Sequence, residues 1–191
     1  MVRVLSVTLV LFGCATSAAT QDAQSPPQGP APQDPGAPGA AAAPATGDSG
    51  TEAWVAAHNA YRAQHCAGPL AWSHEVAKFA QQWAEKLRAG GCNLQHSQGR
   101  YGENLAGGSG GMLDAASSTK MWFDEISKYD FGSGGFSMET GHFTQVVWKG
   151  TTKIGCAKAS CGETDVFVCN YDPPGNVEGG YRDNVAAKGC R

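Results

Sequence analysis

The sequence is short of charge, and no part of it carries a cluster of basic side chains. Its 191 residues include 14 Lys and Arg against 17 Asp and Glu, which gives a net charge of −3. Proteins that bind nucleic acid or anionic membranes through electrostatics need several Lys and Arg side chains on one surface. The composition therefore predicts no nucleic-acid partner and no membrane binding through a charged patch.

Several common functional motifs are also missing. The sequence has no P-loop, no GxGxxG after a candidate strand and no HExxH. These absences exclude the usual signatures of nucleotide-binding proteins and zinc proteases. There is no CxxC pair either, which counts against a structural zinc site built from cysteines.

No apolar run is long enough to cross a bilayer as a mature helix. Residues 1–13, MVRVLSVTLVLFG, place one cation, Arg3, before a short apolar stretch, which is typical of a secretory signal. Two processing routes fit residues 1–19. In one, Cys14 becomes the lipidated first residue of a lipoprotein, and this lipid is then the only membrane anchor. In the other, a peptidase cuts among the small residues of ATSAA.

Residues 20–50 contain no Lys or Arg and most of the ten prolines. Such a segment cannot bury enough apolar surface to offset its ordering entropy, so a disordered, extended linker is predicted. Residues 51–191 are a normal length for one domain. They hold six of the seven cysteines, and in an exported domain this number predicts three disulfides. An extracellular location, secreted or at the cell surface, follows.

Within this domain, helical patterns come first and strand patterns follow. Helices are predicted at 51–65, 73–89 and 113–126, and strands at 142–148, 154–158 and 166–171. Residues 96–108 and 128–141 are rich in glycine and are predicted to be loops. This order favours an α+β fold with separate layers.

Four residues stand out as candidates for chemistry. His96 and Glu103 lie in a polar, glycine-rich segment, and His142 begins a predicted strand. Glu125 follows Trp122 by three residues, so it faces the interior unless the helix is rotated toward solvent. Each residue alone is typical of a solvated or structural side chain. Together, two imidazoles and two carboxylates could form a divalent-metal or acid–base site.

Longer motifs resemble a known family. The chain is similar to the CAP superfamily, which comprises cysteine-rich secretory proteins, venom antigen 5 and plant pathogenesis-related class 1 proteins, and the plant class is the most similar. The resemblance spans nearly all of residues 51–180. The segments that carry it are HNAYRAQHCAGPLAW at 58–72, CNLQHSQGRYGENLA at 92–106, GHFTQVVWKGTTKIGCAKASC at 141–161 and VFVCNYDPPGN at 166–176.

The resemblance implies a three-layer α-β-α sandwich stabilised by disulfides. It also implies a central cleft with a tetrad of His96, Glu103, Glu125 and His142. In family members that bind zinc the two histidines are the ligands, so His96 and His142 are the expected ligands for Zn²⁺ or another divalent metal. His58 matches a structural histidine outside this cleft.

The same comparison implies the disulfide pairs Cys92–Cys161 and Cys156–Cys169. Cys66 and Cys190 depart from the plant pattern and are left to pair with each other. The plant class has a further cysteine pair near 132–141 that this chain lacks, so the loop there is expected to be more mobile.

Three functions remain open. The first is a lipid-binding module for a sterol or fatty acid, with Phe131, Phe136 and Met138 in the matching loop, unless these side chains only pack that loop onto the core. The second is a metal-dependent hydrolase, acting on protein or peptidoglycan, with Glu103 as the base. The third is a surface or interaction protein in which the tetrad supports the fold, with unknown protein partners. The sequence favours binding or interaction over catalysis.

Overall fold

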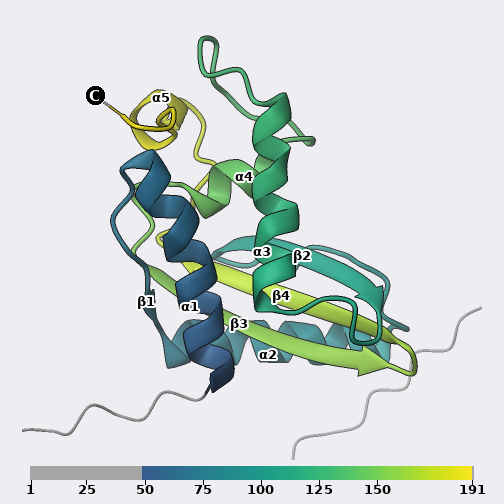
Figure 1. Cartoon of the computed structure of the whole chain (residues 1–191). Helices are drawn as coiled ribbons and strands as arrows, with labels where there is room; N and C mark the ends of the chain where they lie inside the picture. Colours follow the sequence, from purple (N-terminus) through teal and green to yellow (C-terminus); the bar gives the residue numbers. More distant parts are fainter. Residues whose placement is uncertain (1–48, 191) are drawn as a thin grey trace, which may run out of the picture. The chain divides into compact units, whose positions relative to one another are not determined.

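The computed structural model describes residues 49–190, so the predicted signal, Cys14 and nearly all of the predicted linker lie outside the described residues. Its elements in chain order are α1 Ser49–Arg62, η1 Ala63–His65, β1 Ala71–Trp72, α2 His74–Ala89, β2 Gly102–Ser109, α3 Ala115–Asp124, η2 Glu125–Lys128, α4 Gly141–Val146, β3 Lys153–Cys161, β4 Thr164–Asp172 and α5 Tyr181–Asn184 (Figure 1). Within this part of the chain, no helix is both long enough and apolar enough to cross a bilayer.

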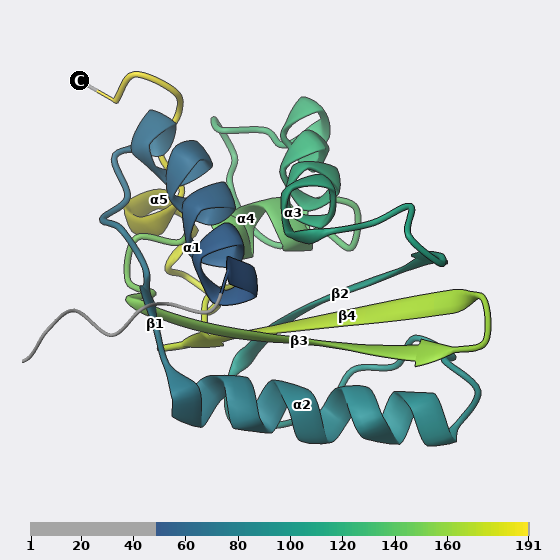
Figure 2. The ribbon, with the colours of Figure 1, turned by 60° about the horizontal axis from the view of Figure 1, so that its bottom comes forward.

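The four strands form one sheet in the order β1-β3-β4-β2. β1 is parallel to β3, whereas the β3–β4 and β2–β4 pairs are antiparallel. Helix α2 covers one face of the sheet, and α1, α3 and α4 lie over the other (Figure 2). This is the three-layer α-β-α sandwich of the α+β class that the sequence predicts.

Strand β4 is buried on both faces of the sheet. Val166 and Val168 pack in the cluster beneath α2, while Phe167 and Tyr171 pack in the larger cluster beneath the other helices. Because neither face is exposed to solvent, the strand has a continuous apolar run instead of an alternating pattern. The run was therefore recognisable as a strand from the sequence alone.

Helix α2 begins and ends where the sequence predicts. The Ser73 hydroxyl accepts a hydrogen bond from the Val76 N–H at 3.4 Å, and the helix stops at Gly90. Gly155 on β3 lets this helix approach the sheet closely, since a Cβ there would collide with the backbone of Ala77.

Helix α4 corrects the prediction of a strand at 142–148. Its residues Phe143 to Val146 are all buried, so no exposed face reveals whether the period is two or 3.6. Glu125 accepts hydrogen bonds from the backbone N–H groups of His142 and Phe143, at 3.0 and 3.1 Å. A carboxylate 17 residues away in sequence therefore satisfies N–H groups that a helix leaves unpaired at its first turn.

Strand β2 corrects the prediction of a loop over residues 96–108. Its sequence GENLAGGS contains three glycines, which are unfavourable in strands. The strand forms because all eight of its residues are in register with β4, from Gly102 opposite Tyr171 to Ser109 opposite Thr164. Pairing with a strand 62 residues further on thus overrides local propensity.

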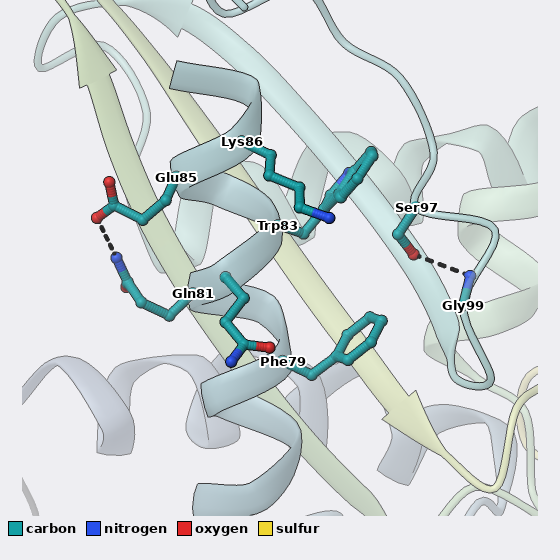
Figure 3. A pocket seen from close by; sticks show the side chains of 8 residues that line it. Phe79, Gln81, Trp83, Glu85, Lys86, Ser97 and Gly99 are labelled. Carbon is teal, nitrogen blue, oxygen red and sulfur yellow. Dashed lines mark hydrogen bonds between the residues drawn. The ribbon is translucent and has the colours of Figure 1, made fainter. Parts of the chain in front are cut away.

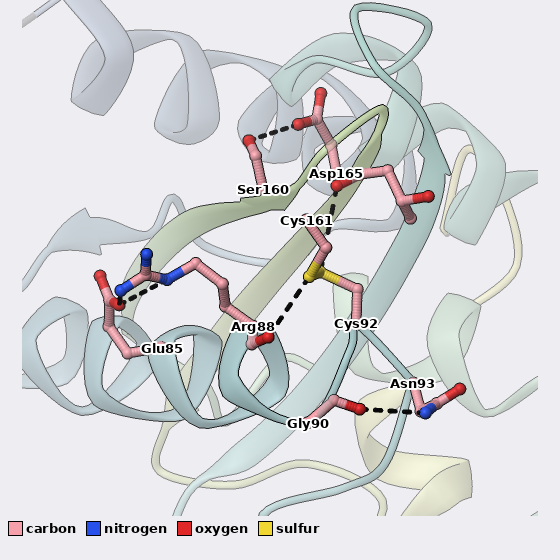
Figure 4. Close-up of a disulfide and its surroundings, with 9 residues drawn as sticks. Glu85, Arg88, Gly90, Cys92, Asn93, Ser160, Cys161 and Asp165 are labelled. Carbon is pink, nitrogen blue, oxygen red and sulfur yellow. Dashed lines mark hydrogen bonds and ion pairs between the residues drawn. A yellow bond between two sulfur atoms is a disulfide. The ribbon is translucent and has the colours of Figure 1, made fainter.

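The structure contains the three expected disulfides, Cys66–Cys190, Cys92–Cys161 and Cys156–Cys169. The second joins the segment just after α2 to the end of β3 (Figure 4). The third links β3 to β4, whose two cysteines lie opposite each other in the sheet. The first ties the end of η1 to the C-terminal segment.

His58 belongs to the core, in agreement with its structural role in the sequence analysis. Its side chain is fully buried, with Nδ1 2.9 Å from the Trp54 carbonyl oxygen and Nε2 2.9 Å from the Tyr171 hydroxyl. Burial lowers the pKa of His58 to about 4, so the ring is neutral at physiological pH. This histidine connects α1 to β4.

Candidate functional site

The four candidate residues form two histidine–glutamate pairs. His96 precedes β2, and Glu103 is the second residue of that strand, whereas Glu125 begins η2 and His142 is the second residue of α4. One pair is therefore positioned by the edge of the sheet and the other by the helical layer.

The first pair is held by main-chain and side-chain donors. Nδ1 of His96 lies 2.8 Å from Oε1 of Glu103, which also accepts the Ser97 N–H at 2.9 Å. The amide of Asn170 donates to the second carboxylate oxygen at 3.3 Å. The Glu103 side chain is 5% exposed and that of His96 is 49% exposed, so the carboxylate supports an imidazole that faces solvent.

The second pair has the same pattern. Nδ1 of His142 lies 2.7 Å from Oε1 of Glu125, and the second oxygen accepts the N–H groups of His142 and Phe143. The imidazole also stacks on Trp122, with ring centroids 6.3 Å apart. Glu125 therefore points inward with Trp122, as expected if the helix is not rotated toward solvent.

The two carboxylates select one tautomer of each histidine. Because a carboxylate only accepts hydrogen bonds, Nδ1 of His96 and Nδ1 of His142 carry the proton. The lone pair of each neutral ring is then on Nε2, which has no hydrogen-bond partner among residues 49–190. A carboxylate behind the Nδ1–H is the usual arrangement of a histidine whose Nε2 binds a metal.

Both histidines line one cavity of about 240 Å³. Its lining combines the first pair, one member of the second pair, two amides, two large apolar side chains and one glycine, namely His96, Glu103, Asn104, Phe136, Met138, Gly141, His142 and Asn176. The structure thus brings the two histidines to the same hollow, with apolar side chains beside them. Glu125 lies behind His142 and does not line the cavity.

Few side chains at this cavity could act as ligands of a metal ion. Across the described part of the chain, no three His, Cys, Asp or Glu side chains group together as a metal site. The two Nε2 atoms fit the role of metal ligands, and both carboxylates are already engaged in orienting the rings. Two protein ligands would leave the remaining coordination positions to water or to another molecule.

The first pair shifts the titration of both partners. Burial alone would raise the pKa of Glu103, but the hydrogen bonds from His96 and Ser97 outweigh burial and lower it. The hydrogen bond to Glu103 is also the largest effect on His96, and it raises the pKa of that imidazole. The charged pair is thus favoured in mildly acidic solution, and the neutral ring is available above the pKa of His96.

The three apolar residues predicted in the loop fall into two groups. Phe136 and Met138 line the histidine cavity and are 59% and 82% exposed. Phe131 does not line it and instead packs on the rings of Tyr129, Phe143 and His65. Phe131 therefore fits the alternative in which an aromatic residue packs the loop onto the core.

Two asparagines of the site were missed by the sequence analysis. Asn104 donates to the His142 carbonyl at 3.1 Å, and Asn176 donates to the Gly141 carbonyl at 2.8 Å. Asn176 also accepts the Thr144 hydroxyl at 2.6 Å. Both hold the start of α4 in place, and the signal that could have identified them is their position in two of the quoted motif segments, at 92–106 and 166–176.

Comparison with known proteins gives one consistent result. The family model described as "CAP: Cysteine-rich secretory protein family" matches residues 55–171. Pathogenesis-related protein 1A of Nicotiana tabacum is 46% identical over 129 residues, which cover 66% of this chain and 76% of that protein. Protein PRY2 of Saccharomyces cerevisiae is 47% identical over 131 residues, which cover 67% of this chain and 38% of that protein.

A solved structure supports the same relationship. The crystal structure of NaASP2 with Zn²⁺ superposes with a TM-score of 0.59 and is 27% identical in sequence. The match covers 77% of this chain and 90% of that one.

Proposed function

Because this chain belongs to the CAP family of cysteine-rich secretory proteins and is of the pathogenesis-related protein 1 type, we propose that its cleft is a binding site for a divalent metal ion and an apolar ligand. The observation that carries the proposal is the cavity in which His96 and His142, each oriented by its own glutamate, lie beside Phe136 and Met138. The two Nε2 atoms would hold the metal. The ligand is a sterol or a fatty acid.

The chemistry of the two pairs supports the metal. Imidazole nitrogen suits Zn²⁺, and a carboxylate on the other ring nitrogen raises the basicity of the ligand. NaASP2, the solved relative at 27% identity, was crystallised with Zn²⁺. When bound, such an ion would supply a Lewis acid, while His96, Glu103, Glu125 and His142 of this chain would fix its position.

The exposure of Phe136 and Met138 supports the apolar ligand. Large apolar side chains that remain exposed next to a cavity are typical of ligand-binding surfaces. Burying one such side chain contributes about 1.5–3 kcal/mol. Phe136 and Met138 therefore offer apolar contact area to a ligand that extends beyond the cavity itself.

The geometry favours binding over hydrolysis. A general base works best when its pKa lies near the operating pH. Both oxygens of the Glu103 carboxylate already accept hydrogen bonds, from His96, Ser97 and Asn170. Because these donors hold the carboxylate in place, the hydrolase in which Glu103 is the base is the less favoured function.

The three disulfides support an oxidising location. Disulfides persist in secreted and cell-surface proteins and are rare in the cytosol. We therefore include an extracellular location, secreted or anchored at the cell surface, in the proposal.

Removing either histidine is expected to abolish stable metal binding. Titration of the full chain with Zn²⁺, followed by calorimetry and native mass spectrometry, should give one ion per wild-type chain. His96→Ala and His142→Ala each remove one of two protein ligands, so affinity should fall at least about 100-fold. Glu125→Gln leaves the ligand in place but loosens its orientation, and a loss of about tenfold is expected.

His74→Ala is the matched control, because His74 is exposed on α2 and does not line the cavity. Its affinity for Zn²⁺ should equal that of the wild type. Equal binding by a His96→Ala/His142→Ala double variant would overturn the proposed metal site.

Truncation of Phe136 and Met138 is expected to weaken lipid binding. The probes are dehydroergosterol and cis-parinaric acid, whose fluorescence reports transfer to the protein. A Phe136→Ala/Met138→Ala variant should bind its preferred probe at least about tenfold more weakly, in line with the loss of buried apolar area. Met112→Ala is the control, since Met112 is 74% exposed but lies outside the cavity. Unchanged affinity in the double variant would remove both residues from the ligand site.

A further inference from the structure

A second and larger hollow lies on the outer side of α2. It has a volume of about 620 Å³ and is formed between this helix and residues 97–99 (Figure 3). Its lining is Phe79, Gln81, Gln82, Trp83, Glu85, Lys86, Ser97 and Gly99. None of these residues lines the histidine cavity, so the function proposed above makes no use of this hollow.

Its two aromatic walls are held rigidly. The Trp83 indole N–H donates to the Gln95 carbonyl at 2.8 Å, and the Phe79 ring meets the Tyr101 ring edge-on at 5.2 Å. Gly99 lies so close to Phe79 that a Cβ there would collide with the ring. Figure 3 shows both rings projecting from α2 toward the 97–99 segment. Rings fixed in this way lose little conformational entropy when a ligand stacks on them.

The rim of the hollow is polar, and some of its side chains have no hydrogen-bond partner within the described residues. Glu85 accepts hydrogen bonds from Gln81 and Arg88, which neutralises its charge locally. Within residues 49–190, the side chains of Gln82 and Lys86 form no hydrogen bond or ion pair, although the Lys86 ammonium lies 5.5 Å from the centre of the Trp83 ring. An amide and an ammonium group are therefore available to a ligand that rests on the aromatic walls.

We propose that this hollow binds a sugar unit of a neutral polysaccharide. One face of a pyranose ring presents C–H groups, which stack favourably on the electron-rich face of an aromatic ring. Its edge presents hydroxyl groups, which the Gln82 amide and the Lys86 ammonium can pair with hydrogen bonds. The volume lies within the range of about 300–1,000 Å³ that is typical of small-ligand sites.

The charge and polarity of the rim argue against a cation and against a wholly apolar ligand. The Lys86 ammonium lies 5.5 Å from the centre of the Trp83 ring and repels a cation from this surface. A wholly apolar ligand would remove Gln82 and Lys86 from water without giving them partners, which costs free energy. A hydroxyl-rich, uncharged ligand avoids both penalties.

The position of the hollow indicates a polymer. Ser97 and Gly99 also line a smaller hollow of about 220 Å³, which includes His96 and Glu103. These two residues in turn line the histidine cavity. Hollows that share walls in this order can accommodate successive units of one chain, so a saccharide of several units fits better than a free monosaccharide.

The test is calorimetric titration of the full, disulfide-bonded chain with three hexasaccharides: chitohexaose, cellohexaose and laminarihexaose. At least one should bind with a Kd below about 1 mM. Trp83→Ala should weaken that binding at least about tenfold. Because Trp83 is half-buried and its removal can disturb α2, the surface variant Gln82→Ala/Lys86→Ala is tested beside it and should show a loss of similar size.

Lys78→Ala is the matched control, since Lys78 is exposed on the same helix but does not line the hollow. It should bind as the wild type does. The proposal is wrong if none of the three sugars binds below that limit, or if Gln82→Ala/Lys86→Ala binds as tightly as the wild type. Binding that is lost in His142→Ala but kept in both hollow variants would also overturn it, by placing the sugar in the histidine cavity instead.

Discussion

Replacing Arg62 with alanine is expected to lower the free energy of unfolding by about 4 kcal/mol. The Arg62 side chain is fully buried, and its donors reach the carbonyl oxygens of Gly68, Val146, Trp148 and Thr151 at 2.8–3.0 Å. Burial lowers its pKa to about 10, so the guanidinium remains charged at neutral pH. The alanine variant would leave a cavity and several carbonyl groups without their donor.

The partners of Arg62 explain why the loss should extend to the site. Val146 is the last residue of α4 and Trp148 follows it closely, so the cation lies where the helix dipole is negative. The same helix carries His142. Loss of Arg62 should therefore weaken Zn²⁺ binding as well as folding.

Urea unfolding at pH 7 measures the effect. Arg62→Lys keeps the charge but not the planar fork of donors, so it should lose about half as much stability as the alanine variant. Arg88→Ala is the surface control, because the Arg88–Glu85 ion pair is exposed and is worth less than about 1 kcal/mol. If Arg62→Ala costs no more than Arg88→Ala, the buried guanidinium is not a main support of the fold.

Removal of the Cys66–Cys190 disulfide should have an effect of similar size. The bond closes a separation of 124 residues, but Cys92–Cys161 already shortens the enclosed loop. The chain that only the Cys66–Cys190 bond constrains runs from Cys66 to Cys92 and from Cys161 to Cys190. These segments are 26 residues (92 − 66) and 29 residues (190 − 161) long. On the chain-entropy model a loop of this length is worth about 4 kcal/mol.

The measurement compares Cys66→Ser/Cys190→Ser with the wild type in guanidinium chloride. Two contacts will hold part of the C-terminal segment in place, namely His65 Nδ1 to the Ala186 carbonyl at 2.6 Å and the Gly189 N–H to the Gln64 carbonyl at 3.0 Å. The double variant should therefore fold but unfold at lower denaturant concentration. A free energy within about 1 kcal/mol of the wild type would contradict the entropic account.

The sequence predicted the helices and strands that are marked by nearby residues, such as a helix cap or a run of apolar side chains. Helix α2 carries its own cap, Ser73, and its own stop, Gly90. Strand β4 has an uninterrupted apolar run because both of its faces are buried. The motif resemblance supplied the layer order and the disulfide pairs, which periodicity alone leaves open.

The elements that were predicted wrongly depend on distant partners. Helix α4 is fixed by Glu125 at its start and by Arg62 near its end, and neither is close to it in sequence. Strand β2 exists through its register with β4. No window of local sequence contains these interactions, so patterns of hydrophobicity could not reveal them.

The same limit applies to the candidate site. Its residue types were identified, and His96, Glu103 and His142 do line one cavity. The sequence could not show that each glutamate binds Nδ1 of its histidine, because this depends on the placement of β2 and α4. It also could not separate Phe131 from Phe136, since both lie in one glycine-rich loop.

The placement of the disulfides divides the described domain into two covalently reinforced parts. Cys92–Cys161 and Cys156–Cys169 tie α2 and the sheet together, while Cys66–Cys190 ties the end of η1, which follows α1, to the C-terminal segment. Between these parts, residues 49–190 contain noncovalent links such as His58 to Tyr171, but no disulfide.

The cleft lies across this boundary. His96 and Glu103 lie at the edge of the sheet, and Glu125 and His142 lie in the helical layer. The Asn104 amide on β2 donates to the His142 carbonyl on α4, so one hydrogen bond joins the two walls directly. The width of the cleft is thus set by this bond and by packing between the layers, and not by either histidine–glutamate pair.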